Sequence, residues 1–311
     1  MVEDYPKTIL DLERRFATED ACREYLFQLR WPTGFVCPRC EGTSVWPATR
    51  GRFVCRACRH QTSVTAGTIF ENTRKPLTLW FRAIWLVTSQ KNGASAANLQ
   101  QTLGLRSYQT AWTWLHKLRR AMIRPGRDRL SGVVEVDETF VGGEDPKDGT
   151  WVEQKAVVVV AAEEDGSGIG RIRMATIPAP TRISLHRFVK ESIDVGSVVH
   201  TDGRPAYRGL EPLGYTHKRT ILIQRKAKHA ASHLLPRVHR VASLLKRWLL
   251  GTHQGAVSAE HLDYYLDEFT FRFNRRTSRS RGKLFYRLLQ QAVEIAPTTY
   301  SSMIGGNKKD T

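Results

Sequence analysis

Two Cys-x-x-Cys pairs limit what this chain can fold into more than any other feature. Cys37 and Cys40 form the first pair, and Cys55 and Cys58 form the second. Zn²⁺ takes four ligands in a tetrahedron, and two thiolates on one tight turn can both reach the same ion. Residues 31–72 are therefore predicted to form a zinc ribbon, because a segment this short needs a metal to hold it together.

Other uses of these cysteines fit the chain less well. Disulfides need an oxidising compartment, whereas the N-terminus lacks the basic and then apolar layout of a signal peptide. A thioredoxin-like redox pair would lie in a βαβ pattern, and neither pair has one around it. Cys22 falls on a predicted helix and is interpreted as an inert, half-buried thiol. His60, two residues after Cys58, is an alternative ligand.

The chain carries a large excess of positive charge. Lysine and arginine number 48 against 30 aspartates and glutamates, giving a net charge of +18 and a pI near 10.0. Such an excess favours a polyanionic partner, since each neutralised phosphate releases condensed counterions. The alternatives are a basic surface kept for solubility and a ribosomal protein.

The sequence predicts no membrane partner. Its densest apolar run, residues 156–162, has the length of a strand, well short of the roughly 20 residues that a bilayer requires. A cytoplasmic, nucleoid-associated protein is therefore expected.

Two helical regions flank the ribbon. Residues 1–30 form a predicted helical lead-in, and residues 73–125 a helix-turn-helix-like DNA-binding region in which Gly104 makes the turn. Its shared core would be Leu99, Leu103, Leu105, Ala111 and Leu115. The face that would enter a major groove comprises Arg106, Tyr108, Gln109, Thr113 and Lys117. A helical hairpin that only packs is the alternative.

Arginines also decorate the ribbon, which suits DNA phosphates, although such ribbons serve as protein–protein modules as well. They are Arg39, Arg50, Arg52, Arg56 and Arg59.

Residues 130–295 alternate strand and helix patterns. Strands are predicted at 133–141, 155–162, 170–177 and 197–200, and helices at 184–193, 234–250 and 259–273. This order predicts a mixed sheet covered by helices. Residues 296–311 are expected to be a flexible tail.

Two aspartates lie in unusual settings within this segment. Asp137 interrupts an apolar strand, and Asp202 ends another. A carboxylate in such a place is costly unless it is paired or bound to a cation, and two at neighbouring strand ends would repel each other unless a divalent cation lay between them. The alternatives are ordinary turn chemistry for Asp202 followed by Gly203, and an arginine partner for Asp137.

The motifs resemble those of bacterial insertion-sequence transposases of the DDE type, over about residues 20–293. The resemblance rests on the ribbon with its flanks at 31–34 and 65–70, on the two aspartate motifs at 135–143 and 200–203, and on the block at 238–276. It implies a multidomain α+β protein with an N-terminal zinc ribbon and a ribonuclease H-like mixed α/β catalytic domain with C-terminal helices. Asp137 and Asp202 would be the first two ligands of the catalytic site, which would hold two Mg²⁺ or Mn²⁺ ions.

The third acidic ligand of such a site is not evident in this sequence. The position expected for it, five residues after His239, holds Leu244, which cannot bind a metal. His239 itself, Glu260 or Glu268 could replace it, or the shell could be completed otherwise. Lys246 matches the basic residue of the motif, and it lies seven residues after His239 on the same face of a predicted helix.

The resemblance implies a transposase that binds terminal repeats and performs metal-dependent cleavage and strand transfer. Its partners would be double-stranded DNA, as transposon ends and target, and further copies of itself in a homodimer or larger oligomer. The basic run 272–287 would contact DNA, or else form a solvated face. The alternatives are a non-catalytic DNA-binding regulator and a ribonuclease H-like nuclease without strand transfer.

Overall fold

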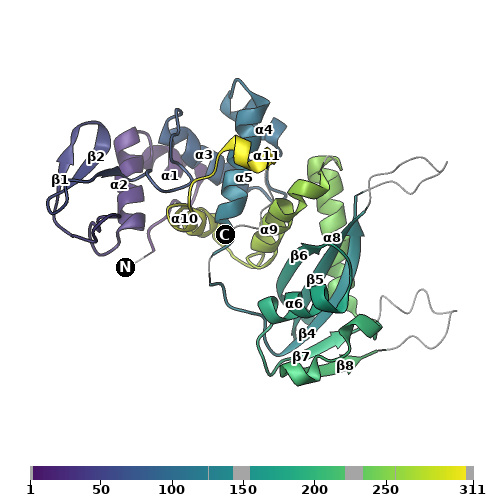
Figure 1. The fold of residues 1–311 in the computed structure, drawn as a ribbon. Helices are drawn as coiled ribbons and strands as arrows, with labels where there is room; N and C mark the ends of the chain where they lie inside the picture. The colour runs from purple at the N-terminus through teal and green to yellow at the C-terminus, as the bar shows by residue number, and fades with distance from the viewer. Residues whose placement is uncertain (1–2, 125, 143–154, 221–233, 256, 306–311) are drawn as a thin grey trace. The chain divides into compact units, whose positions relative to one another are not determined.

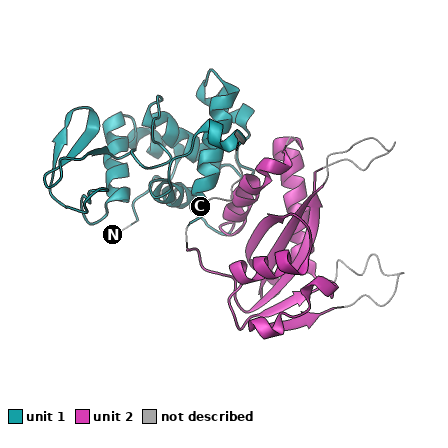
Figure 2. Ribbon diagram, in the orientation of Figure 1, with its two compact units in different colours: residues 1–124, 277–311 teal, residues 125–276 magenta. Residues whose placement is uncertain are grey.

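A computed structural model describes residues 3–124, 126–142, 155–220, 234–255 and 257–305. The chain divides into two compact units, shown in Figure 2. Unit 1 comprises Met1–Arg124 and Thr277–Thr311, and unit 2 comprises Pro125–Arg276. Each unit is described separately.

The N-terminal segment of unit 1 forms two capped helices. These are α1 (Ile9–Arg15) and α2 (Glu19–Arg30). The Thr8 hydroxyl accepts a hydrogen bond from the Asp11 N–H, and the Thr18 hydroxyl accepts one from the Ala21 N–H. Each cap satisfies a backbone donor that the first helical turn leaves free. The predicted helical lead-in therefore consists of two short helices.

The ribbon is a three-stranded antiparallel sheet in the order β1-β2-β3. Its strands are β1 (Val45–Ala48), β2 (Arg52–Cys55) and β3 (Gln61–Ser63), with the short helix η1 (Thr49–Gly51) between the first two. The Phe53 ring lies 5.2 Å from that of Phe27 and 5.8 Å from that of Trp31. This aromatic seam fixes the ribbon against α2.

Three further helices of unit 1 follow the ribbon: α3 (Leu77–Ser89), α4 (Ala96–Leu103) and α5 (Tyr108–Ala121). The indole rings of Trp80 and Trp114 stack at 3.9 Å and join α3 to α5. Gly104 ends α4 in the left-handed region, at φ 62°, a conformation that costs glycine little. The predicted helix–turn–helix is therefore present as a fold.

The C-terminal helices belong to unit 1, which differs from the sequence-based boundaries. Helix α10 (Arg281–Ala292) was expected in the segment 130–295, but its Phe285 is buried against Phe81 and Trp85 of α3. The segment 296–311 was expected to be a flexible tail, yet it contains α11 (Tyr300–Gly305) with a buried Met303. Residues 306–311 lie outside the described residues.

Unit 2 is built on a five-stranded mixed sheet in the order β6-β5-β4-β7-β8. Its strands are β4 (Val133–Val141), β5 (Ala156–Asp165), β6 (Gly168–Ile177), β7 (Val198–Thr201) and β8 (Thr216–Arg219). Strands β4, β5 and β6 pair antiparallel, whereas β7 runs parallel to β4 and β8 parallel to β7. Unit 2 is therefore a mixed α/β fold, as expected.

Helices cover both faces of this sheet (Figure 1). On one face, α8 (Pro236–His253) and α9 (Leu262–Phe273) pack on Val158, Val160 and Ile172, and the short η4 (Ala259–His261) directly precedes α9. On the other, α6 (Arg182–Ser192) packs on Val134, Val136 and Val199. The short helices η2 (Pro205–Tyr207) and η3 (Glu211–Leu213) lie between β7 and β8. Alternation along β4 therefore sends Asp137 toward α8 and its neighbour Glu138 toward the α6 side.

Candidate metal centres

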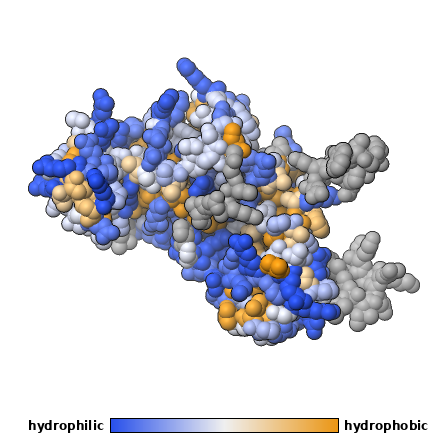
Figure 3. Space-filling model, viewed as in Figure 1, coloured by the Kyte–Doolittle hydropathy of each residue, from blue (hydrophilic) through white to orange (hydrophobic). Residues whose placement is uncertain are grey.

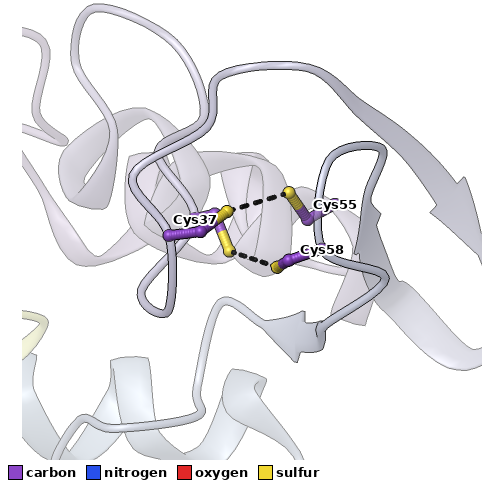
Figure 4. A group of neighbouring side chains, drawn as sticks. Cys37, Cys55 and Cys58 are labelled. Carbon is purple, nitrogen blue, oxygen red and sulfur yellow. Dashed lines mark hydrogen bonds between the residues drawn. The ribbon is translucent and has the colours of Figure 1, made fainter.

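The four predicted cysteines converge in the ribbon. Their sulfur atoms all lie within 4.8 Å of one another. The Cys37–Cys58 and Cys40–Cys55 sulfur pairs are 3.7 and 3.6 Å apart (Figure 4). Four thiolates at a Zn–S distance of about 2.3 Å in a tetrahedron would have sulfurs about 3.8 Å apart. The donor set and its spacing fit a structural Zn²⁺.

Backbone turns arrange these sulfurs. In each Cys-x-x-Cys turn, the N–H of the residue after the second cysteine donates to the carbonyl of the first cysteine: Glu41 donates to Cys37, and Arg59 donates to Cys55. Burial raises the pKa of Cys37, but hydrogen bonds from the Arg39 and Cys40 backbone outweigh it and bring the pKa to about 7. This favours the thiolate that a metal binds.

The other two candidates are not part of this cluster. Among the described residues, the cysteine group contains no histidine, so His60 is not the replacement ligand. Cys22 is fully buried on α2, and burial raises its pKa to about 12. It is an inert thiol, as interpreted, but it is buried completely rather than half-buried.

Strand pairing in unit 2 brings Asp137 and Asp202 together. On β4 and β7, Glu135 pairs with His200 in parallel register. Asp137 and Asp202 each follow this pair by two residues, so both carboxylates lie toward the same end of two neighbouring strands. Asp202 lies directly after β7, where the Arg204 N–H donates to its Oδ1 at 2.9 Å.

His239 of α8 completes this group. Its Nε2 lies 3.8 Å from Oδ2 of Asp137. Burial is the largest cause of the raised pKa of Asp137, and the nearby Asp202 raises it further, whereas His239 and the Glu138 N–H lower it. Two carboxylates and an imidazole that meet in a half-buried site form a donor set for a divalent cation.

An arginine partner for Asp137, the alternative that the sequence left open, is not found among the described residues. Within the described parts of the chain, the lysine and arginine side chains make no ion pair with Asp137 or Asp202. Asp202 is exposed rather than buried. Only the first of the two aspartates therefore carries the burial cost that the sequence suggested for both, and Asp202 remains accessible to solvent and ligands.

Glu138, which sequence reasoning did not single out, lies beneath this site on the α6 side. Its side chain is 2% exposed, and its Oε2 is 3.7 Å from Nε of Arg204. Burial raises the pKa of Glu138 to about 7, while Arg204 opposes that shift. Arg204 is thus held by Glu138, which leaves the carboxylate of Asp202 free of its side chain.

Glu135 is a second residue whose role the sequence did not indicate. Its carboxylate is 1% exposed and accepts hydrogen bonds from the backbone N–H groups of Arg237, at 2.8 Å, and Val238, at 3.0 Å. Nη1 of Arg237 lies 2.9 Å from the same carboxylate. Glu135 therefore caps the first turn of α8 and fixes it to β4. Glu135 lies two residues before Asp137 on the strand, and its partners Arg237 and Val238 lie directly before His239 on the helix.

This anchor predicts a large loss of stability in Glu135→Ala. The substitution leaves the N-terminus of α8 uncapped and removes one of two carboxylates around Arg237, so we expect a loss of about 3 kcal/mol, the lower end for a broken buried pair. Urea unfolding measures it. Arg187→Ala, which breaks the exposed pair with Glu191, serves as control and should change the unfolding free energy by less than about 0.5 kcal/mol. Equal effects would show that Glu135 is not an anchor.

Glu135 also belongs to a cluster with Glu164 and His200 whose ligand atoms lie within 4.8 Å of one another. Arg237 occupies this cluster, because its Nη1 lies 2.9 Å from Glu135 and 3.1 Å from Glu164. Burial lowers the pKa of His200. The guanidinium bridges both carboxylates, so we interpret this group as an ion-pair network rather than a second cation site.

The remaining candidates for the third ligand are placed differently. Leu244 packs against the apolar core of the sheet. Glu268 is fully buried, but its carboxylate lies 3.0 Å from Nε of Arg272, and Glu260 is exposed in η4. Lys246 is exposed on α8, about 10 Å along the helix from His239. Of these described residues and His239, only His239 forms a close contact with Asp137.

The predicted DNA-contacting side chains are only partly available. Arg106, Tyr108 and Gln109 are exposed at the start of α5, and Thr113 is half-buried. Lys117 instead donates to the Ile69 carbonyl at 3.2 Å. It therefore serves the packing of unit 1 rather than an exposed recognition face.

The basic run 272–287 is largely occupied within the protein. Arg272 pairs with Glu268, and Arg276 donates to the Ile169 and Gly170 carbonyls. Lys283 and Arg287 both pair with Glu3. The division between the units also falls inside this run. These four side chains have partners within the protein, and contact of the run with DNA stays a prediction.

No helix among the described residues is long and apolar enough to cross a membrane. The visible face of the molecule is largely hydrophilic, with scattered hydrophobic patches (Figure 3).

Comparisons with known proteins agree with this architecture. Residues 129–274 match the model of the ISXO2-like transposase domain, and residues 17–61 match that of the transposase zinc-ribbon domain. A relative from Halobacterium salinarum, described as an uncharacterized protein in transposable element ISH50, is 28% identical over 291 residues, which cover 87% of this chain and 95% of the relative.

A solved structure, the catalytic core domain of BIV integrase, aligns with 49% of this chain and 89% of that chain, at 17% sequence identity and a TM-score of 0.32. The two family matches and the relative agree with the motif resemblance in the sequence. The chain is therefore similar to insertion-sequence transposases, through a transposase zinc-ribbon domain at residues 17–61 and an ISXO2-like transposase domain at residues 129–274.

Proposed function

We propose that this protein is a DNA transposase that binds the terminal repeats of an insertion sequence and catalyses metal-dependent cleavage and strand transfer. The observation that carries the proposal is the meeting of Asp137, Asp202 and His239 at one end of the central sheet. The strand order, with three antiparallel strands followed by two parallel ones, supports a ribonuclease H-like fold for unit 2.

Each residue of the site has a distinct role in this proposal. Asp137 and Asp202 hold Mg²⁺ or Mn²⁺, with His239 Nε2 as the third protein ligand. When bound, such cations stabilise the charge that develops on the phosphoryl oxygens during in-line displacement. Lys246, further along α8, neutralises a phosphate of the same DNA strand.

The chain's own residues also keep the site open. Glu135 fixes the start of α8, so that His239 faces Asp137, and Glu138 holds the Arg204 side chain. Cleavage requires a water molecule as the nucleophile, and strand transfer requires the freed 3′-hydroxyl of the transposon end. The exposed side of the site, at Asp202, is where the DNA backbone would enter.

Duplex DNA, as transposon ends and target, is the proposed partner, and the protein would act as a homodimer or larger oligomer. Purified protein, Mg²⁺ and duplexes that carry the element's inverted repeats test the proposal. We expect nicking at the repeat ends and joined products on denaturing gels. Binding without cleavage would identify a DNA-binding regulator, and cleavage without joining would identify a nuclease.

The assignment of His239 can be tested against its rivals. His239→Ala should lower the cleavage rate at limiting Mg²⁺ by roughly 10–100-fold, the range for groups that support metal binding, and a higher Mg²⁺ concentration should restore part of it. Glu260→Ala is the matched control, since this carboxylate is exposed, and it should leave the rate unchanged. The opposite pattern would transfer the third-ligand role to Glu260.

A further inference from the structure

A basic cleft lies in unit 1, and none of the four ribbon cysteines lines it. Its volume is about 450 Å³. Three segments line it: the start of α2, the ribbon from η1 to the residues after β3, and the linker that precedes α3. The lining contains five cationic side chains and one carboxylate, namely Arg23, Arg50, Arg52, Arg74, Lys75 and Glu19.

The single carboxylate is already used. Oε1 of Glu19 accepts a hydrogen bond from the Thr78 N–H at 3.1 Å. Helix α3 begins at Leu77 after Pro76 and has no side-chain cap of its own, so Glu19 supplies that cap from α2. Arg23 lies 3.7 Å from Glu19 and 2.9 Å from Asp20. These contacts explain two of the six charged groups.

The other four cations have no such partner. Arg50, Arg52, Arg74 and Lys75 are all exposed, and in the described parts of the chain they make no ion pair. Four like charges that share one concave surface repel each other, and the folded chain does not compensate for them. Their arrangement is favourable only when an external anion enters the cleft.

The backbone of the ribbon contributes to this concavity. Arg50 has a φ of 61° and Gly51 a φ of 68°. An added Cβ at Gly51 would lie 3.1 Å from Cδ of Arg23. Glycine at this position therefore allows the hairpin to lie close to α2, which brings the ribbon arginines beside the linker cations.

We propose that this cleft binds the phosphodiester backbone of duplex DNA and so joins the ribbon and the first helices into one DNA-gripping surface. The lining offers cations and hydroxyls, and its described residues include no aromatic ring on which a base could stack. Contacts of this kind position DNA without reading its sequence. The choice of DNA as the polyanion rests on the proposed function.

The test compares two double variants with the same loss of charge. Arg52→Gln with Lys75→Gln removes one cation without an ion-pair partner from the ribbon and one from the linker, and leaves a neutral polar side chain at each position. Arg182→Gln with Lys190→Gln removes two exposed cations from α6 of unit 2. Binding of a duplex with the inverted repeat is measured by fluorescence anisotropy across a salt series without added divalent cation, so that cleavage does not enter. Zinc content and thermal melting confirm that each variant is folded.

We expect the cleft variant to bind about tenfold or more weakly and to lose about 1.8 from the magnitude of the slope of log K against log[salt], the value for two phosphate contacts. Hydroxyl-radical footprints should lose protection over one short stretch of backbone. The α6 variant should match the wild type in all three readouts. A cleft variant that binds like the α6 variant would overturn the proposal.

These outcomes separate the two proposals. If the cleft variant binds weakly with a reduced salt slope but the wild-type protein never cleaves DNA, the cleft proposal is supported and the transposase proposal is refuted. Unchanged binding by a cleft variant that still cleaves in an Asp137-dependent manner would refute the cleft alone.

Discussion

Asp137→Asn and Asp202→Asn are each expected to abolish metal-dependent cleavage of the inverted repeats while leaving DNA binding intact. Asparagine keeps the shape of the side chain but removes the negative charge that holds a divalent cation. The cation supplies several kcal/mol of transition-state stabilisation, so each variant should be at least about 10³-fold slower. Single-turnover cleavage of labelled duplex measures the rate, and anisotropy measures binding.

The control for this prediction is Asp165→Asn. Asp165 is an exposed carboxylate at the end of β5 in the same sheet. Strand β4 lies between β5 and β7. It should cleave at the wild-type rate. If all three variants retained activity, the aspartate pair would not be the catalytic centre. If the first two lost binding as well as cleavage, their role would be structural.

Loss of the ribbon metal is expected to have the second large effect. Cys55→Ser removes one of four sulfurs from a fully buried position. Binding of structural zinc contributes roughly 10–16 kcal/mol in isolated zinc modules, far more than the aromatic seam with α2 can replace. We therefore expect zinc content to fall from one ion per chain toward zero, proteolysis within residues 31–72, and loss of DNA binding.

Cys22→Ala is the matched control for the cysteine prediction. Cys22 is as buried as Cys55 but lies outside the sulfur cluster. This variant should keep one zinc ion and bind DNA normally. Zinc retention in Cys55→Ser, measured by a colorimetric chelator after denaturation, would contradict the four-sulfur site. Zinc loss in Cys22→Ala would mean that the ligand set is different.

Much of unit 2 was predictable because local patterns and tertiary packing agree there. The apolar run around Asp137 predicted β4 at 133–141, and the structure has the same bounds. The alternation in 170–177 predicted most of β6, which begins two residues earlier. The helix expected from Ser184 begins at Arg182, because Thr181 accepts the capping bond from the Ser184 N–H. Thr181, and not Ser184, is therefore the N-cap of this helix.

Only those residues of the candidate aspartate site that stand out within their own strand could be predicted from the sequence. The two aspartates stood out because Asp137 interrupts an apolar stretch and Asp202 directly follows another. Glu135 was overlooked, since its meaning depends on α8, whose first turn lies more than 100 residues later in the chain. Its position two residues before Asp137, on the same face of the strand, was the available signal. Glu138 likewise acquires its role only when η2 brings Arg204 close.

Long-range packing also explains the differences in domain layout. Helix α10 follows unit 2 in the sequence, but its apolar side completes the core around Phe81. A local pattern specifies that such a helix has a buried face and does not specify which partner covers it. The ion pairs of the basic run 272–287 could not be predicted for the same reason, because the carboxylate partner Glu3 lies at the other end of the chain.

Anomalous scattering from Mn²⁺ in crystals of the protein bound to a repeat-end duplex would test the central claim most directly. The account predicts a manganese peak in contact with carboxylate oxygens of both Asp137 and Asp202, with Nε2 of His239 in its coordination shell and a DNA phosphate beside it. Manganese at any other position, with the Arg204 guanidinium or another cation between the two aspartates, would contradict it.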